Sequence, residues 1–324
     1  MGRTYSDGKP PALARVIEIG AEEGGQRIDN FLLRHLKGVP RSHVYRVLRS
    51  GQVRVNSGRI RADYRLKTGD RVRVPPVRGA AAPARPPRPS PVLQRLEAAV
   101  LYEDEGLLIL NKPAGMAVHG GSGLSYGVIE ALRALHPHAS SLELVHRLDR
   151  ATSGCLMVAK KRSVLRALHD LLRRGQIDKR YLALVAGRWR GGEREVSAAL
   201  VKNVLQGGER MVKVGAQGKP AVSRFRPLQV FHNASLVEVR LDTGRTHQIR
   251  VHAAHIGHPL AGDDKYGDAA FNRRMRSFGL RRLFLHAHAL LFTLPGTPRE
   301  VHVSAPLEPD LRLVLDALET HETV

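Results

Sequence analysis

One aspartate lies in the segment of the sequence that is best suited to catalysis. The segment HRLDRATSG spans residues 146–154 and contains Asp149, which is followed closely by Thr152, Ser153 and Gly154. Hydroxyls and backbone N–H groups in a tight turn can hold a carboxylate in place without burying it. A carboxylate held in this way can act as a nucleophile or as a general base. The same residues could equally form a capped turn without chemistry, and the segment alone leaves both interpretations open.

A second polar segment, DTGRTHQIR, spans residues 242–250 and leads into a helical pattern of apolar residues. The pattern predicts a helix over residues 246–256 with Thr246 as its N-cap. Arg245 would then lie at the helix start, where the helix N-terminus also favours an anion. We therefore expect a carboxylate or a phosphate beside Arg245.

Three histidines in this region could suggest a metal site. His252, His255 and His258 follow one another at intervals of three residues. However, no glutamate stands in an HExxH context, and the third histidine falls beyond Gly257, which should end the helix. The sequence therefore predicts no metal site.

Ser125 suggests a different alternative, a hydrolase. Gly123–Gly127 matches the glycine–serine–glycine spacing of a nucleophile elbow. That elbow requires an apolar strand directly before the serine, whereas a glycine-rich stretch precedes Ser125. A hydrolase is the weakest of the interpretations.

The composition indicates a folded chain with a polyanionic partner. Apolar residues make up 42% of the 324 residues, and 52 Lys and Arg face 30 Asp and Glu, for a net charge of +22. Such a charge favours a nucleic acid, with an anionic membrane surface as the alternative. No apolar stretch is long enough to span a bilayer, the N-terminus lacks a signal-peptide core, and Cys155 has no second cysteine to pair with. We therefore expect a cytoplasmic protein without a membrane partner.

A proline-rich stretch divides the chain. Residues 75–91 contain seven prolines in seventeen positions and no acid, which predicts an extended linker. The expected order is a disordered N-terminus over 1–14, a first domain over 15–74, the linker, and a second domain over 92–324. Residues 1–91 carry nineteen Lys and Arg against seven Asp and Glu, so the first domain is the more densely basic one.

The first domain should contain two short helices followed by short strands. Its helices and hairpin carry basic residues that have few acidic neighbours in the sequence, which favours contact with RNA or DNA over an ordinary solvated face. The predicted nucleic-acid contacts are Arg27, Arg41, Arg46, Arg49 and Arg54.

The second domain is predicted to be α+β with a large mixed or antiparallel sheet, because its strands outnumber its helices and do not alternate with them regularly. The expected strands are 107–110, 144–148, 155–159, 181–185, 224–230, 236–241, 283–294 and 301–304. The expected helices are 127–135, 164–174, 246–256 and 310–318.

Five long motifs together resemble the RluA-type pseudouridine synthases, and the front domain resembles the S4 RNA-binding module that many of them carry. The resemblance covers roughly residues 15–320, in the family's order. The motifs are LNKPAGMAVHGG at 110–121, HRLDRATSG at 146–154, KRYLALVAG at 179–187, GRTHQIRVHAAHIGHPLAGDDKYG at 244–267 and RLFLHAHAL at 282–290, with QRIDNFLLRHLKGVPRSHVYRVLRSGQVRVNSGRI in front.

The resemblance implies a role for five residues. Asp149 would be the essential catalytic carboxylate, and Arg245 would pair with it and keep it ionised. Tyr181 would stack on the uracil, and Leu285 would pack against it. Arg147 would fill the space that the flipped base leaves.

The resemblance also implies an isomerisation of uridine that needs no metal and no cofactor. The carboxylate could attack C1′ of the ribose, attack C6 of the base, or take the C2′ proton, and the sequence leaves all three open. The expected partner is 23S ribosomal RNA or an assembly intermediate of the large subunit, without an obligate protein partner. A related enzyme acting on other uridines or on tRNA, and a non-catalytic RNA-binding factor, remain alternatives.

Overall fold

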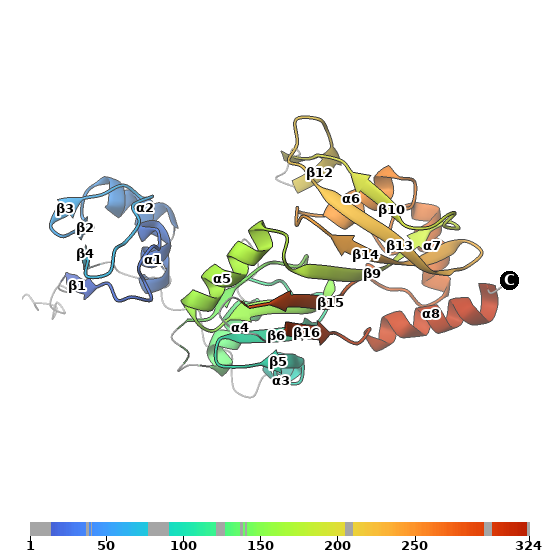
Figure 1. The fold of residues 1–324 in the computed structure, drawn as a ribbon, viewed down its shortest axis with the longest axis horizontal. Coiled ribbons are helices and arrows are strands. Elements are labelled where there is room, and N and C mark those ends of the chain that lie inside the picture. Colours follow the sequence, from blue (N-terminus) through green and yellow to red (C-terminus); the bar gives the residue numbers. More distant parts are fainter. Residues whose placement is uncertain are drawn as a thin grey trace, which may run out of the picture. The chain divides into compact units, whose positions relative to one another are not determined.

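The computed structural model describes residues 14–36, 39, 41–76, 91–120, 127–136, 139, 141–204, 210–294 and 300–322. The chain forms two compact units, residues 1–88 and 89–324, which are described separately (Figure 1). Residues 1–13 of the expected disordered N-terminus and most of the expected linker lie outside the described residues. The last linker residue, Pro91, begins a helix.

The first unit packs two helices against a small antiparallel sheet. Its strands have the order β1-β4-β2-β3. Valine and arginine alternate along β4, so that Val72 and Val74 are buried while Arg71 and Arg73 are exposed. Its elements are β1 (Arg15–Glu18), α1 (Ile28–His35), α2 (Arg41–Arg49), β2 (Arg54–Val55), β3 (Gly58–Arg59) and β4 (Arg71–Val74).

The second unit is built on a mixed sheet, which confirms the predicted α+β class. Its main path among the described residues is β10-β13-β14-β9-β15-β8-β6-β5, with β16 beside β15 and β7 beside β8. Only β15 and β8 pair in parallel among the registers described. A separate hairpin consists of β11 (Leu200–Val204) and β12 (Arg210–Val214). The other strands are β5 (Val100–Glu103), β6 (Leu107–Lys112), β7 (Glu143–Leu144), β8 (Ser153–Ala159), β9 (Asp178–Ala186), β10 (Arg194–Ser197), β13 (Val222–Val230), β14 (Ala234–Leu241), β15 (Leu285–Thr293) and β16 (Glu300–Ser304).

Helices cover both faces of this sheet, because successive residues of its central strands point to opposite sides. On β6, Leu108 and Leu110 join the apolar cluster of α3 and α4, whereas Leu107 and Ile109 join that of α5. The cluster of α3 and α4 also includes Tyr181 and residues of α6. The helices of this unit are α3 (Pro91–Glu97), α4 (Val128–Leu135), α5 (Arg162–Arg173), α6 (Gln248–His255), α7 (Ala269–Ser277) and α8 (Pro309–Glu322).

Two predicted elements are wrong in their extent. The strand expected over 144–148 ends at Leu144. Beyond that residue, the backbone N–H of Met157 in β8 donates to the His146 ring and not to a backbone carbonyl, so the strand pairing does not continue. The helix expected to begin after Thr246 begins at Gln248, because His247 has a left-handed backbone with φ of 54°. The sequence patterns did not predict α3 or α7.

Candidate active site

A cleft in the second unit brings together all five residues that were predicted for the site. They come from the loop before β8, from the start of β9, from the segment before α6 and from the start of β15. The lining residues are Arg147, Leu148, Asp149, Thr152, Tyr181, Leu241, Arg245, His247, Gln248, Ile249, Arg250 and Leu285.

Asp149 sits in a turn that its own backbone closes. Thr152 donates its N–H to the Asp149 carbonyl at 3.1 Å. The next residue, Arg150, is tied to Gly115 twice: its carbonyl accepts from the Gly115 N–H, and its Nε donates to the Gly115 carbonyl, each at 2.8 Å. The side chain of Asp149 keeps 20% of its surface exposed. The carboxylate is therefore fixed by its loop and accessible from the cleft.

A buried lysine supports the same loop. The Lys112 ammonium donates to three carbonyls, those of Pro113 at 2.8 Å, Met116 at 2.9 Å and Arg150 at 3.4 Å. Its side chain has no exposed surface, and this burial lowers the pKa of Lys112 to about 7. Three carbonyls match the three donors of an ammonium group, so the lysine joins the end of β6 to the Asp149 loop.

Arg250, on the first turns of α6, forms the ion pair with Asp149. Its Nη1 lies 3.5 Å from Asp149 Oδ2. Its other two nitrogens donate to the two oxygens of Asp263, Nε at 2.8 Å and Nη2 at 2.7 Å. This paired geometry fixes the guanidinium plane and directs its remaining nitrogen at Asp149. Asp263 thus acts on Asp149 through Arg250.

The prediction that Arg245 pairs with Asp149 is corrected by this arrangement. Arg245 is exposed, lines the cleft, and donates its Nε to the carbonyl of Pro220 at 3.2 Å. The helix N-cap is His247, which has a left-handed backbone and lies one residue after the predicted Thr246. In this arrangement Arg250 rather than Arg245 points at the carboxylate.

Asp263 is held as an ionised group in the protein interior. Its side chain has no exposed surface. Burial alone would raise the pKa of Asp263, but hydrogen bonds from Arg250 and from the backbone of Lys265 and Tyr266 lower it below its usual value. The buried charge is therefore matched by donors on every side. Neither Asp263 nor Arg250 was among the predicted site residues, although both lie in the motif at 244–267.

Tyr181 and Leu285 form an apolar wall of the cleft. Tyr181 is 8% exposed and Leu285 is 4% exposed, and both belong to the apolar cluster that reaches α6. Burial, together with the nearby Asp149, raises the pKa of the Tyr181 phenol above its usual value, so the ring stays neutral. The wall can receive a flat, apolar ring face. Arg147 is exposed at the cleft.

His252, which was considered as a metal ligand, makes structural contacts instead. His252 is fully buried, with its ring nitrogens at 3.0 Å from Ser223 Oγ and from the Ala198 carbonyl. In the described part of the chain, no group of three or more His, Cys, Asp or Glu side chains could hold a metal ion. Burial raises the pKa of the Cys155 thiol to about 12. Ser125 lies outside the described residues.

The predicted arginines of the first unit have different surroundings. Arg27 forms a paired contact with Asp29, at 2.7 Å for the shorter bond. Arg46 and Arg49 are exposed on α2, and the side chain of Arg41 lies outside the described residues. Arg54 is exposed on β2 and lines a concave surface together with Arg71 and Arg73 of β4, which the sequence analysis did not single out.

Comparison with known proteins identifies the class. Residues 106–255 match the family model described as RNA pseudouridylate synthase, and residues 26–72 match the S4 domain. Over 96% of its length, the chain is 54% identical to a curated relative. It belongs to the RNA pseudouridylate synthase family and is an RNA pseudouridine synthase carrying an S4 domain.

The most similar relatives share one description. The chain is 54% identical over 315 residues to "Ribosomal large subunit pseudouridine synthase C" of Yersinia pestis, covering 96% of this chain and 98% of the relative. It is 54% identical over 309 residues to the protein of the same description from Escherichia coli strain K12, covering 94% and 96%. This agrees with the family inferred from the sequence motifs.

Solved structures give the same fold. The chain is similar to human RNA pseudouridylate synthase domain containing 4, with a TM-score of 0.58 and 26% identity, covering 70% of this chain and 95% of that one. For human RNA pseudouridylate synthase domain containing 1, the TM-score is 0.54 and the identity 28%, covering 66% and 85%. In the described ranges, no helix combines the length and the apolar character that crossing a bilayer requires.

Proposed function

We propose that this enzyme converts specific uridines of 23S ribosomal RNA, free or in a large-subunit assembly intermediate, to pseudouridine, with Asp149 as the catalytic residue. The observation that carries the proposal is the geometry around Asp149. A partly exposed carboxylate, 3.5 Å from Arg250, faces a cleft with Tyr181 and Leu285 on its wall. The names of the most similar relatives support the choice of large-subunit RNA.

The reaction is an isomerisation. The C1′–N1 bond breaks, the base turns, and a C1′–C5 bond forms; C5 then loses its proton and N1 carries one. Asp149 acts by attack on C1′, by attack on C6, or by removal of the C2′ proton. Each of these steps uses the carboxylate oxygens, and the Arg250 guanidinium, 3.5 Å away, holds one of them in place. The bonds broken and formed balance without a redox group or a metal.

The cleft residues around Asp149 receive the base. The target uridine must leave its stack to enter the cleft, where Tyr181 stacks on the ring and Leu285 packs against it. Arg147 is exposed beside Asp149 and fills the space that the base vacates. Arg245, 3.2 Å from the Pro220 carbonyl, is left to contact the RNA backbone at the mouth of the cleft.

The first unit anchors the RNA. Its exposed arginines contact phosphates, which position the substrate but do not select the uridine. The proposed boundaries are residues 15–74 for the anchor, 75–91 for the linker and 92–324 for the catalytic domain. The enzyme works in the cytoplasm on RNA, without an obligate protein partner.

The test of this function is Asp149→Asn. We expect the variant to form no pseudouridine in 23S RNA taken from cells that lack the enzyme, because an amide can neither attack nor accept the proton. RNA affinity and melting temperature should stay close to those of the wild type, since the side chain contributes little to the core. Glu195→Gln, which makes the same chemical change on the exposed edge strand β10, is the control and should keep full activity. Substantial turnover by Asp149→Asn would refute the assignment.

A further inference from the structure

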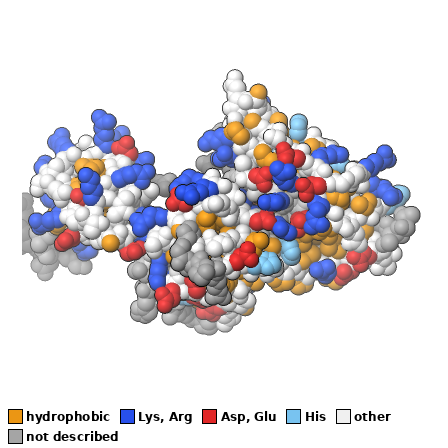
Figure 2. Space-filling view, in the orientation of Figure 1, with side chains coloured by type: hydrophobic (Ala, Val, Ile, Leu, Met, Phe, Trp, Pro, Cys, Tyr) orange, Lys and Arg blue, Asp and Glu red, His pale blue; other side chains and the backbone are white. Residues whose placement is uncertain are grey.

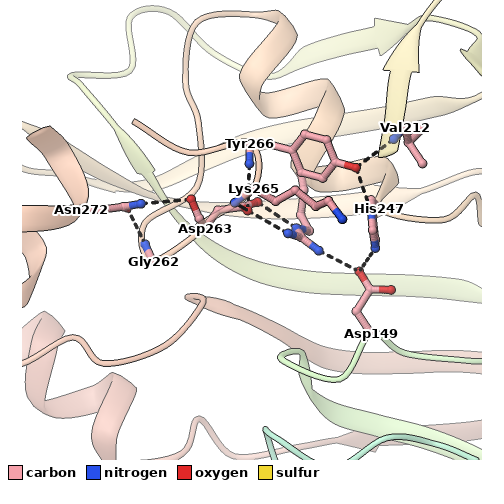
Figure 3. A network of polar contacts seen from close by, with 9 residues as sticks. Asp149, Val212, His247, Gly262, Asp263, Lys265, Tyr266 and Asn272 are labelled. Carbon is pink, nitrogen blue, oxygen red and sulfur yellow. Dashed lines mark hydrogen bonds and ion pairs between the residues drawn. The ribbon is translucent and has the colours of Figure 1, made fainter. Parts of the chain in front are cut away.

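A chain of polar contacts connects the β11–β12 hairpin to Asp149 (Figure 3). The backbone N–H of Val212, in β12, donates to the Tyr266 hydroxyl at 3.0 Å. The same hydroxyl lies 2.8 Å from His247 Nδ1. On the other side of the ring, His247 Nε2 lies 3.7 Å from Asp149 Oδ2.

The contacts at both ends of this chain select one form of His247. A backbone N–H can only donate, so the Tyr266 hydroxyl accepts from Val212 and has its own proton free for His247 Nδ1. The ring then carries its proton on Nε2, the nitrogen that faces Asp149. The other tautomer would direct the Nε2 lone pair at a carboxylate oxygen. Burial lowers the pKa of His247, which keeps the ring neutral.

The local backbone and ring packing hold His247 in this orientation. Its φ of 54° places it in the left-handed region, which residues other than glycine adopt rarely. Its ring packs edge-on against that of Tyr266, with centroids 5.5 Å apart. The Tyr266 ring also lies under the Arg250 guanidinium, at 5.0 Å. One tyrosine therefore contacts both side chains that reach Asp149.

The hairpin at the other end carries positive charge. Lys202 and Lys213 are exposed on its strands, and a groove between the hairpin and the segment before α6 is lined by Lys202, Lys219 and Arg245. In the described residues the two strands pair only with each other, apart from a bridge between Leu200 and Lys219. RNA phosphates bound in this groove would act directly on the strand that holds Val212.

We propose that His247 is a positioning residue for Asp149, held as its Nε2–H tautomer by Tyr266 and the β12 backbone, so that RNA bound at the hairpin sets the orientation of the carboxylate. This inference rests on the proposed function of Asp149. At 3.7 Å the contact between His247 and Asp149 is longer than a hydrogen bond, and a small shift of the hairpin and Tyr266 would close it.

The test is Tyr266→Phe, which removes the hydroxyl and keeps the ring beneath Arg250. We expect the single-turnover rate at saturating RNA to fall about tenfold, because the chain of polar contacts loses one of its groups. RNA affinity should change by less than twofold, because no contact with RNA is removed. Nitrogen chemical shifts of labelled histidine should change at His247 from a single Nε2–H form to a mixture of tautomers.

Two further variants separate a positioning role from a purely structural one. Tyr102→Phe, on the edge strand β5, also removes a bonded hydroxyl, at 2.7 Å from Asp104, and should change neither the rate nor the His247 shifts. His247→Gln presents an amide N–H on a side chain of similar reach and should keep more of the rate than His247→Ala.

Two results would overturn the inference. One is a wild-type rate in Tyr266→Phe. The other is a slowed Tyr266→Phe whose His247 tautomer is unchanged. Failure of the proposed function would look different, because Asp149→Asn would then remain active in the same assay.

Discussion

In each unit of this protein, three arginines lie side by side across antiparallel strands. Among the described side chains, carboxylates form ion pairs with these arginines only in the second unit. In the first unit Arg54 lies directly opposite both Arg73 and Arg59. In the second unit Arg240 lies directly opposite both Arg224 and Arg180. Like charges in such positions repel one another, so a compensating charge would stabilise each row.

The row of the second unit finds that charge within the protein. Arg224 bonds Glu195 at 2.7 Å, Arg180 bonds Asp178 at 2.8 Å, and Arg240 reaches Asp178 at 3.4 Å. Figure 2 shows Lys and Arg side chains interleaved with Asp and Glu side chains over this part of the molecule. Each arginine of this row is thus paired with a carboxylate of the protein.

The row of the first unit has no such partners. Among the residues that the structure describes, no carboxylate forms an ion pair with Arg54, Arg59 or Arg73, and all three are exposed. Arg54 and Arg73 donate instead to backbone carbonyls, those of Ser57 and Gln52, each at 3.3 Å. RNA phosphates would supply the missing charge. Of the two similar surfaces, we therefore propose the first-unit row as the one that contacts RNA.

The largest expected effect concerns acid, to which the two units should respond at different pH. Burial lowers the pKa of His146 and of His286 to about 4, and both lie in the second unit. Between pH 6.5 and 4 the unfolded chain binds protons that the folded chain excludes. The second unit should therefore lose stability as pH falls through this range, by up to about 3 kcal/mol for each histidine.

The first unit should keep its stability in that range. Its lowered carboxyl pKa values, those of Asp29 and Asp70, matter only below the usual carboxyl range near 4. Urea unfolding followed by Trp189 fluorescence reports the second unit alone, because the chain has one tryptophan. His286→Gln should remove part of the acid sensitivity, and the exposed His255→Gln should not. Equal urea midpoints at pH 6.5 and 4.5 would contradict this prediction.

The residues of the site and of the first row show how much of each could be predicted from the sequence alone. Asp149, Tyr181 and Leu285 could be located because each lies in a long motif, and motif order is a property of the sequence. Arg250 could not be chosen over Arg245, because the choice depends on where the helix begins, and the left-handed backbone at His247 places its N-cap one residue after the predicted Thr246. Similarly, nothing local marks Arg54 and Arg73 as neighbours, since strand register brings them together from positions nineteen residues apart.

A smaller effect is expected from neutralising the first row. Arg54→Gln, Arg59→Gln and Arg73→Gln combined should weaken RNA binding on the order of 10- to 100-fold and reduce the slope of log affinity against log salt by about 2, because up to three phosphate contacts are lost. The melting temperature should stay constant or rise, since the arginines no longer repel one another. Arg224→Gln with Arg240→Gln is the control and should leave affinity within about twofold. An equal loss of affinity in both variants would remove the distinction between the rows.

The smallest effect is expected from the same control variant, measured as stability. Arg224→Gln with Arg240→Gln should lower the free energy of unfolding by about 1 kcal/mol, because exposed ion pairs contribute roughly 0.2–1 kcal/mol each. The loss leaves Glu195 and Asp178 without these partners, so it should shrink in about 1 M salt, where the Debye length falls to roughly 3 Å. Urea unfolding at low and high salt measures both quantities.

For the first row, salt should act in the opposite sense, stabilising the wild type relative to its neutralised variant, because there it screens repulsion. A loss of stability in the first-row variant that salt abolishes would mean that its arginines, too, are paired within the protein, and the assignment of that row to RNA would fail.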